Sequence, residues 1–328
     1  MSSSNARGQQ KRPDNLRMPN ETGTHDPSTR LNNTWLAVYV TEFAVIFLIN
    51  GFTIITFARD DHIRKRTTYL IINLAVADLL VGGLSGPMHI YHTLTFKPDS
   101  GFSWRKFTVL YFDNAFTACS LLNLALLSLE RLHATIFPFR HSRMMNSVYL
   151  KAVICIWLLA LIPASVDAAL FLTDSKASQI VWASLIIIVL LIIIVSYMII
   201  TFNVKRNVLP QLSGARASDR KLTVTLFIVT ALSTLAILPW FFDAVLGVRG
   251  FNGLSPTAKL NIHQSINVLF YANSFVNPLI YTLRMQEFRK AAQIWCRKNS
   301  ERQRQSFQMS SISRINALPD AQVAVNSS

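Results

Sequence analysis

The sequence predicts an all-α membrane protein, a bundle of seven transmembrane helices. Of its 328 residues, 51% are hydrophobic and only 15% are charged, whereas soluble domains carry roughly 25% charged residues. Seven apolar stretches come near the ~20 residues that cross a hydrocarbon core about 30 Å thick. Backbone groups in lipid must satisfy their own hydrogen bonds, and barrel strands are shorter and alternating, so these stretches are predicted to be helices. They span residues 35–58, 68–92, 107–130, 150–172, 180–202, 222–246 and 262–283.

The positions of the basic residues predict the orientation. The formal net charge is +15, which by itself also suits a nucleic-acid-binding protein. However, 21 of the 32 Lys and Arg residues fall in the loops after the first, third and fifth stretches or in the C-terminal tail. Basic residues concentrate on the cytoplasmic side of membrane proteins. We therefore expect a multi-pass plasma-membrane protein with an extracellular N-terminus, and the nucleic-acid interpretation is dropped.

The terminal segments predict two disordered tails. Residues 1–34 are polar, lack the apolar core of a signal peptide and carry glycosylation sequons at Asn20 and Asn32. Residues 299–328 are polar and rich in serine, which suits either a kinase substrate or a plain solvated tail. The bundle itself is assigned to residues 35–284. None of the three cysteines falls in an outer loop, so no extracellular disulfide is expected.

Ionisable residues inside the apolar stretches are candidates for function. Each costs at least ~2.5–3.5 kcal/mol to place in lipid, so each needs a reason to be there. Two of them, Asp167 and Asp243, lie near the outer ends of their helices and are expected to reach water. The role of Glu42 stays open. The others are Asp78, Asp113, Glu130 and Arg131.

The third stretch places a carboxylate and an arginine on one face. Asp113, Thr117, Ser120 and Arg131 recur at intervals that are typical of one helix face. Asp113 and Arg131 are 18 residues apart, about 27 Å along a helix. With Arg131 at the cytoplasmic boundary, Asp113 lies in the outer third of the bundle, where it can bind a cation that arrives from outside. The alternative is a buried Asp whose partner is a neighbouring hydroxyl group.

The sixth and seventh stretches each contain a proline among polar or aromatic residues. Pro239 is followed by Trp240 and Phe241, and Pro278 follows Asn277. Proline removes a backbone hydrogen bond and kinks a helix. Kinked helices that pivot suit a conformational switch.

In these motifs the chain resembles a rhodopsin-like (class A) G protein-coupled receptor, over residues 35–297. Asn73-Leu-Ala-Val-Ala-Asp78 lies 28 residues after Asn50, as in the family. The third helix ends in Glu130-Arg131-Leu132, and the seventh closes with Asn277-Pro278-Leu-Ile-Tyr281. The remaining matches are Pro138, Trp157, Tyr197, Pro239 and Phe288, the last at the start of a short amphipathic eighth helix over residues 285–298.

The resemblance implies roles for particular residues. Arg131 is expected to be held at rest by Glu130 and Asp219, and to be freed for a heterotrimeric G protein when the sixth helix swings outward, with Tyr197 and Tyr281 holding the open state. A buried sodium site is implied at Asp78, Ser120, Asn273, Ser274 and Asn277. Cys296 resembles the palmitoylated cysteine that ends helix eight, or is a free thiol. Arrestin and a receptor kinase are further implied partners, and no enzymatic activity or cofactor is expected.

The pocket residues resemble those of aminergic receptors. Asp113 stands where these receptors bind an ammonium group, Tyr271 where a tyrosine bonds that carboxylate, and Trp240 and Phe241 match paired aromatics. With Thr117, these residues form the predicted ligand site. Several departures count against an amine: Ile237 replaces the usual Trp, the disulfide cysteine is replaced by Lys106, and helix five offers only Ser184 in its outer half. Melanocortin and cannabinoid receptors share the missing disulfide, so a peptide or lipid ligand stays open.

Other classes of membrane protein fit less well. An opsin needs a lysine for retinal at the position of Tyr271. A secondary transporter usually shows internal repeats, and none is found in the sequence. A zinc hydrolase needs clustered ligands, whereas only His89 and His92 share a helix face, where interfacial polar residues are the simpler interpretation.

Overall fold

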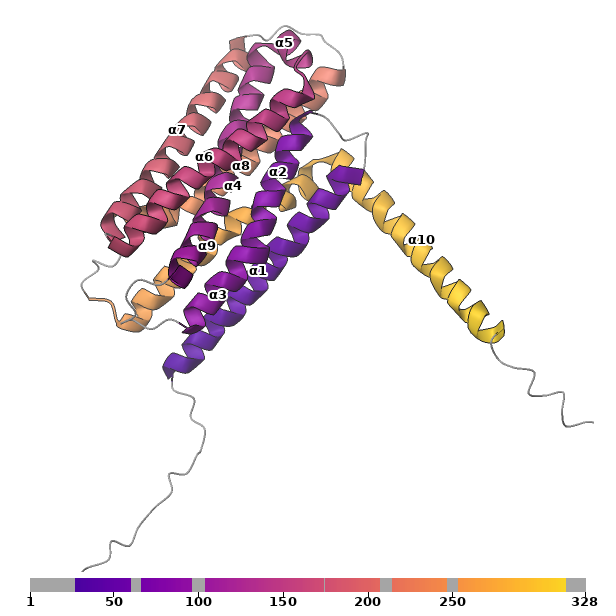
Figure 1. Ribbon diagram of the computed structural model, residues 1–328. Coiled ribbons are helices and arrows are strands. Elements are labelled where there is room, and N and C mark those ends of the chain that lie inside the picture. Colours follow the sequence, from indigo (N-terminus) through magenta and orange to yellow (C-terminus); the bar gives the residue numbers. More distant parts are fainter. Residues whose placement is uncertain are drawn as a thin grey trace, which may run out of the picture.

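The computed structural model describes residues 27–59, 66–95, 104–173, 175–206, 214–246 and 253–316, and their regular structure is helical. Seven spans lie side by side as a bundle, and a further helix leaves it (Figure 1). The second span is built from α2, a π-helical turn (η1) and α3. The elements are α1 (Pro27–Arg59), α2 (Arg66–Leu80), η1 (Val81–Ser85), α3 (Gly86–Thr95), α4 (Trp104–Ile136), α5 (Pro138–Ser142), α6 (Asn146–Thr173), α7 (Ser175–Arg206), α8 (Gly214–Leu246), α9 (Pro256–Arg284) and α10 (Gln286–Asn316).

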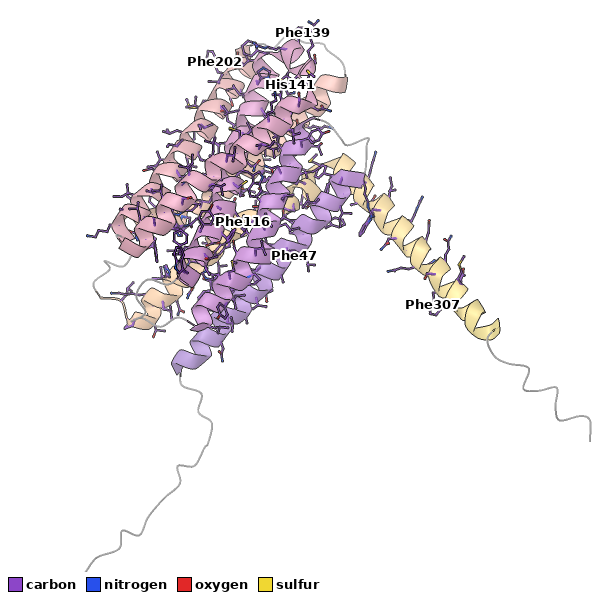
Figure 2. The ribbon with its side chains drawn as sticks, in the orientation of Figure 1. Phe47, Phe116, Phe139, His141, Phe202 and Phe307 are labelled. Atoms are coloured by element: carbon purple, nitrogen blue, oxygen red, sulfur yellow. The ribbon has the colours of Figure 1, made fainter. Side chains whose placement is uncertain are left out.

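The lengths and composition of the helices confirm the predicted membrane bundle. Six spans within the described residues are long and apolar enough to cross a bilayer. The seventh, α9, is more polar, but it packs between α8 and α1. Large apolar side chains cover the outside of the bundle, among them Phe47 and Phe202, which are 44% and 66% exposed (Figure 2). Such a surface is stable against acyl tails and unfavourable in water.

Helix α4 forms the centre of the bundle. It packs against α2, α6, α7 and α8. Its buried Asn123 accepts a hydrogen bond from Asn73 of α2 (2.8 Å), and Asn73 in turn accepts one from the indole of Trp157 of α6 (2.9 Å). Side-chain hydrogen bonds across helices help to hold transmembrane bundles together. This chain of bonds fixes three spans at mid-depth.

The π-helical turn brings the second span unusually close to α1. A Cβ atom added at Gly82 would lie 2.7 Å from the backbone nitrogen of Phe47 and 2.8 Å from the backbone oxygen of Phe43. Only glycine fits at such a distance. The wide turn also re-aims the outer segment α3, which carries His89 toward α1.

The prediction that Asp167 reaches water is wrong. Its side chain is only 3% exposed and accepts hydrogen bonds from Asn114 of α4 (2.5 Å) and Ser178 of α7 (2.6 Å). Asp167 therefore joins the outer ends of α4, α6 and α7. Asp243 lies 3.6 Å from His263 of α9, whose side chain is half-exposed.

Helix α10 is longer than the predicted eighth helix. It continues to Asn316, beyond residue 298, so residues 299–316 are helical rather than disordered. The sequence over this range contains neither glycine nor proline, so nothing in it ends the helix. The first turns pack on the bundle through buried Phe288, whose ring lies 5.1 Å from that of Phe57. Beyond them α10 diverges as a separate rod (Figure 1). At the other end, α1 begins at Pro27, inside the segment predicted to be a tail.

Candidate functional site

The outer site is built on Asp113 of α4. The hydroxyl of Tyr271 of α9 donates a hydrogen bond to Asp113 Oδ2 (2.9 Å). The other oxygen, Oδ1, is buried and has no hydrogen-bond partner among the described residues, although the Ser85 hydroxyl lies nearby. Tyr271 thus orients the carboxylate and leaves one oxygen available. A buried, half-satisfied carboxylate is a strong attractor for a cation.

Aromatic side chains from the first and second spans wall this carboxylate. The ring of His89 lies 5.7 Å from Tyr271 and 5.2 Å from Tyr39, and Phe43 lies 4.9 Å from Tyr271. His89 is also within electrostatic reach of Asp113. The sequence suggested only an interfacial role for His89, because its direction depends on the π-helical turn that precedes it.

Trp240 and Phe241, the predicted aromatic pair, contact different residues. Trp240 of α8 contacts Trp182 of α7 (6.3 Å) and Phe270 of α9 (5.4 Å), and Phe270 lies 5.6 Å from Tyr271. Trp240 is therefore linked to the Asp113 site through two rings. Phe241 packs on Phe242, 5.7 Å away. Thr117 is buried one turn below Asp113, and Ile237 is buried in the core.

A second polar cluster lies at mid-depth around Asp78. This carboxylate is fully buried and accepts hydrogen bonds from Ser120 (2.7 Å) and Asn277 (2.8 Å). Ser274 lies within its reach, and Asn50 bonds the backbone oxygen of Ser274 (2.9 Å). The Asn273 Oδ1 atom is buried without a partner in the described part of the chain. The five residues predicted for a cation site are thus all buried, and four of them meet at Asp78.

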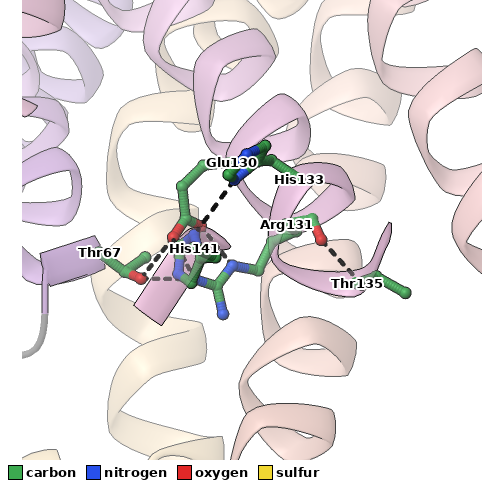
Figure 3. A network of polar contacts seen from close by, with 6 residues as sticks. All are labelled: Thr67, Glu130, Arg131, His133, Thr135 and His141. Atoms are coloured by element: carbon green, nitrogen blue, oxygen red, sulfur yellow. Dashed lines mark hydrogen bonds and ion pairs between the residues drawn. The ribbon is translucent and has the colours of Figure 1, made fainter. Parts of the chain in front are cut away.

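The inner site holds Arg131 in a closed network (Figure 3). Its guanidinium group forms an ion pair with Glu130 and donates a hydrogen bond to Thr67 of α2. Thr67 donates to Glu130 Oε1 (2.9 Å), and His141 of α5 lies 3.4 Å from the same oxygen. His133 stands 3.4 Å from His141. Arg131 is 3% exposed, so its guanidinium group is not accessible at this end of α4.

Of the two tyrosines predicted for the open state, Tyr197 lies within electrostatic reach of Arg131 and Glu130, and Tyr281 lies within reach of Tyr197. The hydroxyls of Tyr197 and Tyr281 are buried and, within the described residues, form no hydrogen bond. The Tyr197 ring packs on Phe227 of α8, 4.9 Å away. Two buried hydroxyls that have no partner among the described residues suit a second arrangement of the helices.

The predicted prolines occupy distinct places. Pro239 and Pro278 lie inside α8 and α9, and Asn277 Oδ1, next to Pro278, accepts a hydrogen bond from Ser233 of α8 (3.2 Å). Pro138 begins the short exposed helix α5.

Several predicted residues lie outside what the structure describes. Asn20 precedes the first described residue, and the side chains of Asn32, Asp219 and Cys296 are not among those placed. Thr67 and His141 were not predicted as partners of the Glu130–Arg131 pair. No local pattern marks them, because both reach it only when α2 and α5 pack on α4.

Comparisons with known proteins agree with this arrangement. A sequence profile described as 7 transmembrane receptor (rhodopsin family) matches residues 49–179. The chain is 25% identical to the human (Homo sapiens) neuromedin-U receptor 1 over 307 residues, 78% of this chain and 71% of the relative. It is 24% identical to the rat (Rattus norvegicus) alpha-1A adrenergic receptor over 344 residues, 86% of this chain and 72% of the relative. The human histamine H4 receptor is 31% identical over 150 residues, covering 44% of this chain and 37% of that receptor.

The profile match lies across the second to fourth spans, which carry Asp78, Asp113 and the Glu130–Arg131 pair. The longer alignments extend this similarity over most of the bundle. The chain is a multi-pass membrane protein whose sequence is similar to the rhodopsin family of seven-transmembrane receptors.

Proposed function

We propose that this receptor binds a cationic amine through Asp113. The observation that carries the proposal is the carboxylate itself, one oxygen of which is held by Tyr271 while the other is buried without a partner in the described structure. An ammonium group supplies both the charge and the donor that this oxygen lacks. The rings of Tyr271, Phe43 and His89 present aromatic surface around it, which favours cations. Two of the similar receptors, the adrenergic and histamine receptors, are named for amines.

Binding would be transmitted to a heterotrimeric G protein through Arg131. We propose that the receptor lies in the plasma membrane with its N-terminus outside, so that Asp113 would face the extracellular side and Arg131 the cytoplasm. Release of Arg131 from Glu130 and Thr67 exposes a cation at the inner end of α4. Tyr197 and Tyr281, whose hydroxyls have no partner at rest in the described bundle, would then bond within the open state. Asp219 would add a second carboxylate to the resting latch.

The Asp78 cluster suits a sodium ion. Its oxygen-rich set of a carboxylate, two hydroxyls and an amide matches a hard cation, and the partnerless Asn273 Oδ1 offers a further ligand. Asp78, Ser120, Ser274, Asn273 and Asn277 would hold the ion, which neutralises the buried carboxylate. Because Asn277 also contacts Ser233 of α8, these residues would couple the ion to the position of α8.

The terminal segments would carry modifications and partners. Asn20 and Asn32 are proposed as glycosylation sites, and Cys296 as a palmitoylation site that ties α10 to the membrane. A receptor kinase and arrestin would act on serines of the C-terminal segment.

The amine proposal is tested by G protein nucleotide exchange with the purified receptor and a panel of amines. Asp113→Asn should lower agonist potency at least about 100-fold, since it removes one charge of a buried pair. Tyr271→Phe removes one hydrogen bond and should cost about 5–30-fold. The matched control is Asp243→Asn, another outer carboxylate, which should leave potency unchanged. Equal potency of wild type and Asp113→Asn contradicts the proposal.

A peptide with a free N-terminal ammonium is the second candidate. The neuromedin-U receptor aligns over 78% of the chain, about as much as the adrenergic receptor. Acetylating the N-terminus of an active peptide tests this candidate. The acetylated peptide should lose potency if its ammonium group pairs with Asp113, and should keep its potency if it does not.

A further inference from the structure

A second buried carboxylate stands unpaired in the first span. Glu42 of α1 is 9% exposed, and neither of its side-chain oxygens has a hydrogen-bond partner among the described residues. An unpaired carboxylate inside the hydrocarbon layer costs several kcal/mol on general grounds unless a proton or a cation neutralises it. The ligand site described above does not use this residue.

Glu42 lines a groove between α1 and α9. The groove has a volume of about 900 Å³, and Glu42 is the only ionisable residue among the described residues that line it. Ala37, Thr41 and Val45 of α1 form one wall, and Val268 and Phe275 of α9 form the other. Thr41 and Val45 are exposed on the outside of the bundle, so the groove opens toward the acyl tails.

Two hydrogen bonds join α1 to α9 beside the groove, through residues that do not line it. The indole of Trp35 donates a hydrogen bond to Asn261 Oδ1 (3.0 Å), and the hydroxyl of Tyr39 donates one to Gln264 Oε1 (2.5 Å). Both bonds join α1 to α9 at or above the level of Glu42. The groove itself extends past Thr41 to the exposed residues Asn33 and Thr34, so a partner for the carboxylate can enter from this polar end or sideways from the outer leaflet.

We propose that the groove between α1 and α9 binds a lipophilic amine, whose ammonium group pairs with Glu42 and whose apolar body lies along Val45, Val268 and Phe275. A soluble cation lacks the apolar body that this lining favours, and an anionic amphiphile is repelled by the carboxylate. Neither Asp113 nor Tyr271 lines the groove, although Tyr271, which bonds Asp113, lies within electrostatic reach of Glu42, so the two sites are neighbours with different linings. The inference does not depend on the identity of the agonist.

The experiment measures the melting temperature of the full-length receptor in phosphatidylcholine nanodiscs. Dodecylamine is the probe, with 1-dodecanol as its neutral analogue and butylamine as its short-chain analogue. At tenfold over its Kd, dodecylamine should raise the Tm of the wild type by about 3 °C or more. Because a cationic amine can also pair with Asp113, the variants are compared in an Asp113→Asn background, where the rise should persist and should disappear when Glu42→Gln is added.

A second variant keeps the test independent of the charge change. Thr41→Trp fills the exposed mouth of the groove, leaves Glu42 intact and should also abolish the shift. The proposal is overturned if dodecylamine has no effect on the wild type, or if dodecanol or butylamine matches it. It is equally overturned if, in the Asp113→Asn background, the shift is already lost or survives the addition of Glu42→Gln or Thr41→Trp, because the amine then binds elsewhere.

Discussion

Replacing Thr67 with alanine is expected to raise the ligand-free activity of the receptor. Thr67 is 4% exposed, accepts a hydrogen bond from the Arg131 guanidinium and donates one to Glu130 (2.9 Å). Hydrogen bonds to charged groups contribute about 1.5–3 kcal/mol each. Because the Glu130–Arg131 ion pair remains in the variant, we take the lower end, about 1.5 kcal/mol. That loss falls on the resting state alone and shifts the population toward the open state about tenfold.

The assay is basal nucleotide exchange on a purified G protein, per receptor, in nanodiscs without ligand. Thr135→Ala is the matched control: Thr135 donates to the backbone oxygen of Arg131 (2.8 Å) and does not touch its guanidinium. We expect Thr67→Ala to exchange nucleotide several-fold to tenfold faster than wild type, and Thr135→Ala to match wild type. Equal basal rates in all three would refute the closed network as a latch.

Three further predictions concern packing and ions. Gly82→Ala should lower the Tm by several degrees, since overpacking costs about 1–3 kcal/mol. Gly51→Ala is the control and should leave the Tm unchanged, because its new Cβ meets only a side chain at 3.5 Å. Equal Tm values for the two variants would contradict the close approach of the helices at Gly82. Asp167→Ala should destabilise the receptor by about 1–3 kcal/mol, because it leaves Asn114 without its acceptor. Thermal unfolding monitored with a thiol dye measures this loss. A loss under about 0.5 kcal/mol would mean that the hydrogen bonds of Asp167 are dispensable. Sodium chloride should raise the Tm of wild type more than potassium chloride does, and Asp78→Asn should erase that difference, while a difference that survives would place the ion elsewhere.

The sequence predicted the seven spans and the main buried charges for a physical reason. Apolar stretches of bilayer length and ionisable residues inside them are local features, readable without a fold. The spacing of Asp113 and Arg131 on one face of α4 also follows from helix geometry alone. Pairing Asp113 with Tyr271 needed the resemblance to aminergic receptors, because 158 residues separate them.

Features that depend on packing between helices escaped the sequence. The π-helical turn at Val81–Ser85 re-aims His89, and no residue pattern marked it in advance. Asp167 looked like an interfacial carboxylate until α4 and α7 supplied its donors. The groove beside Glu42 exists only because α9 returns to lie against α1.

The most direct test of the account removes the arginine that the inner network holds. Arg131→Ala should abolish both basal and ligand-stimulated nucleotide exchange, including the added activity of Thr67→Ala in the double variant. Binding of the ligand at the outer site should persist, since Arg131 lies about 27 Å along α4 from Asp113. Exchange that continues at the wild-type rate without this guanidinium would contradict the claim that its release transmits the signal.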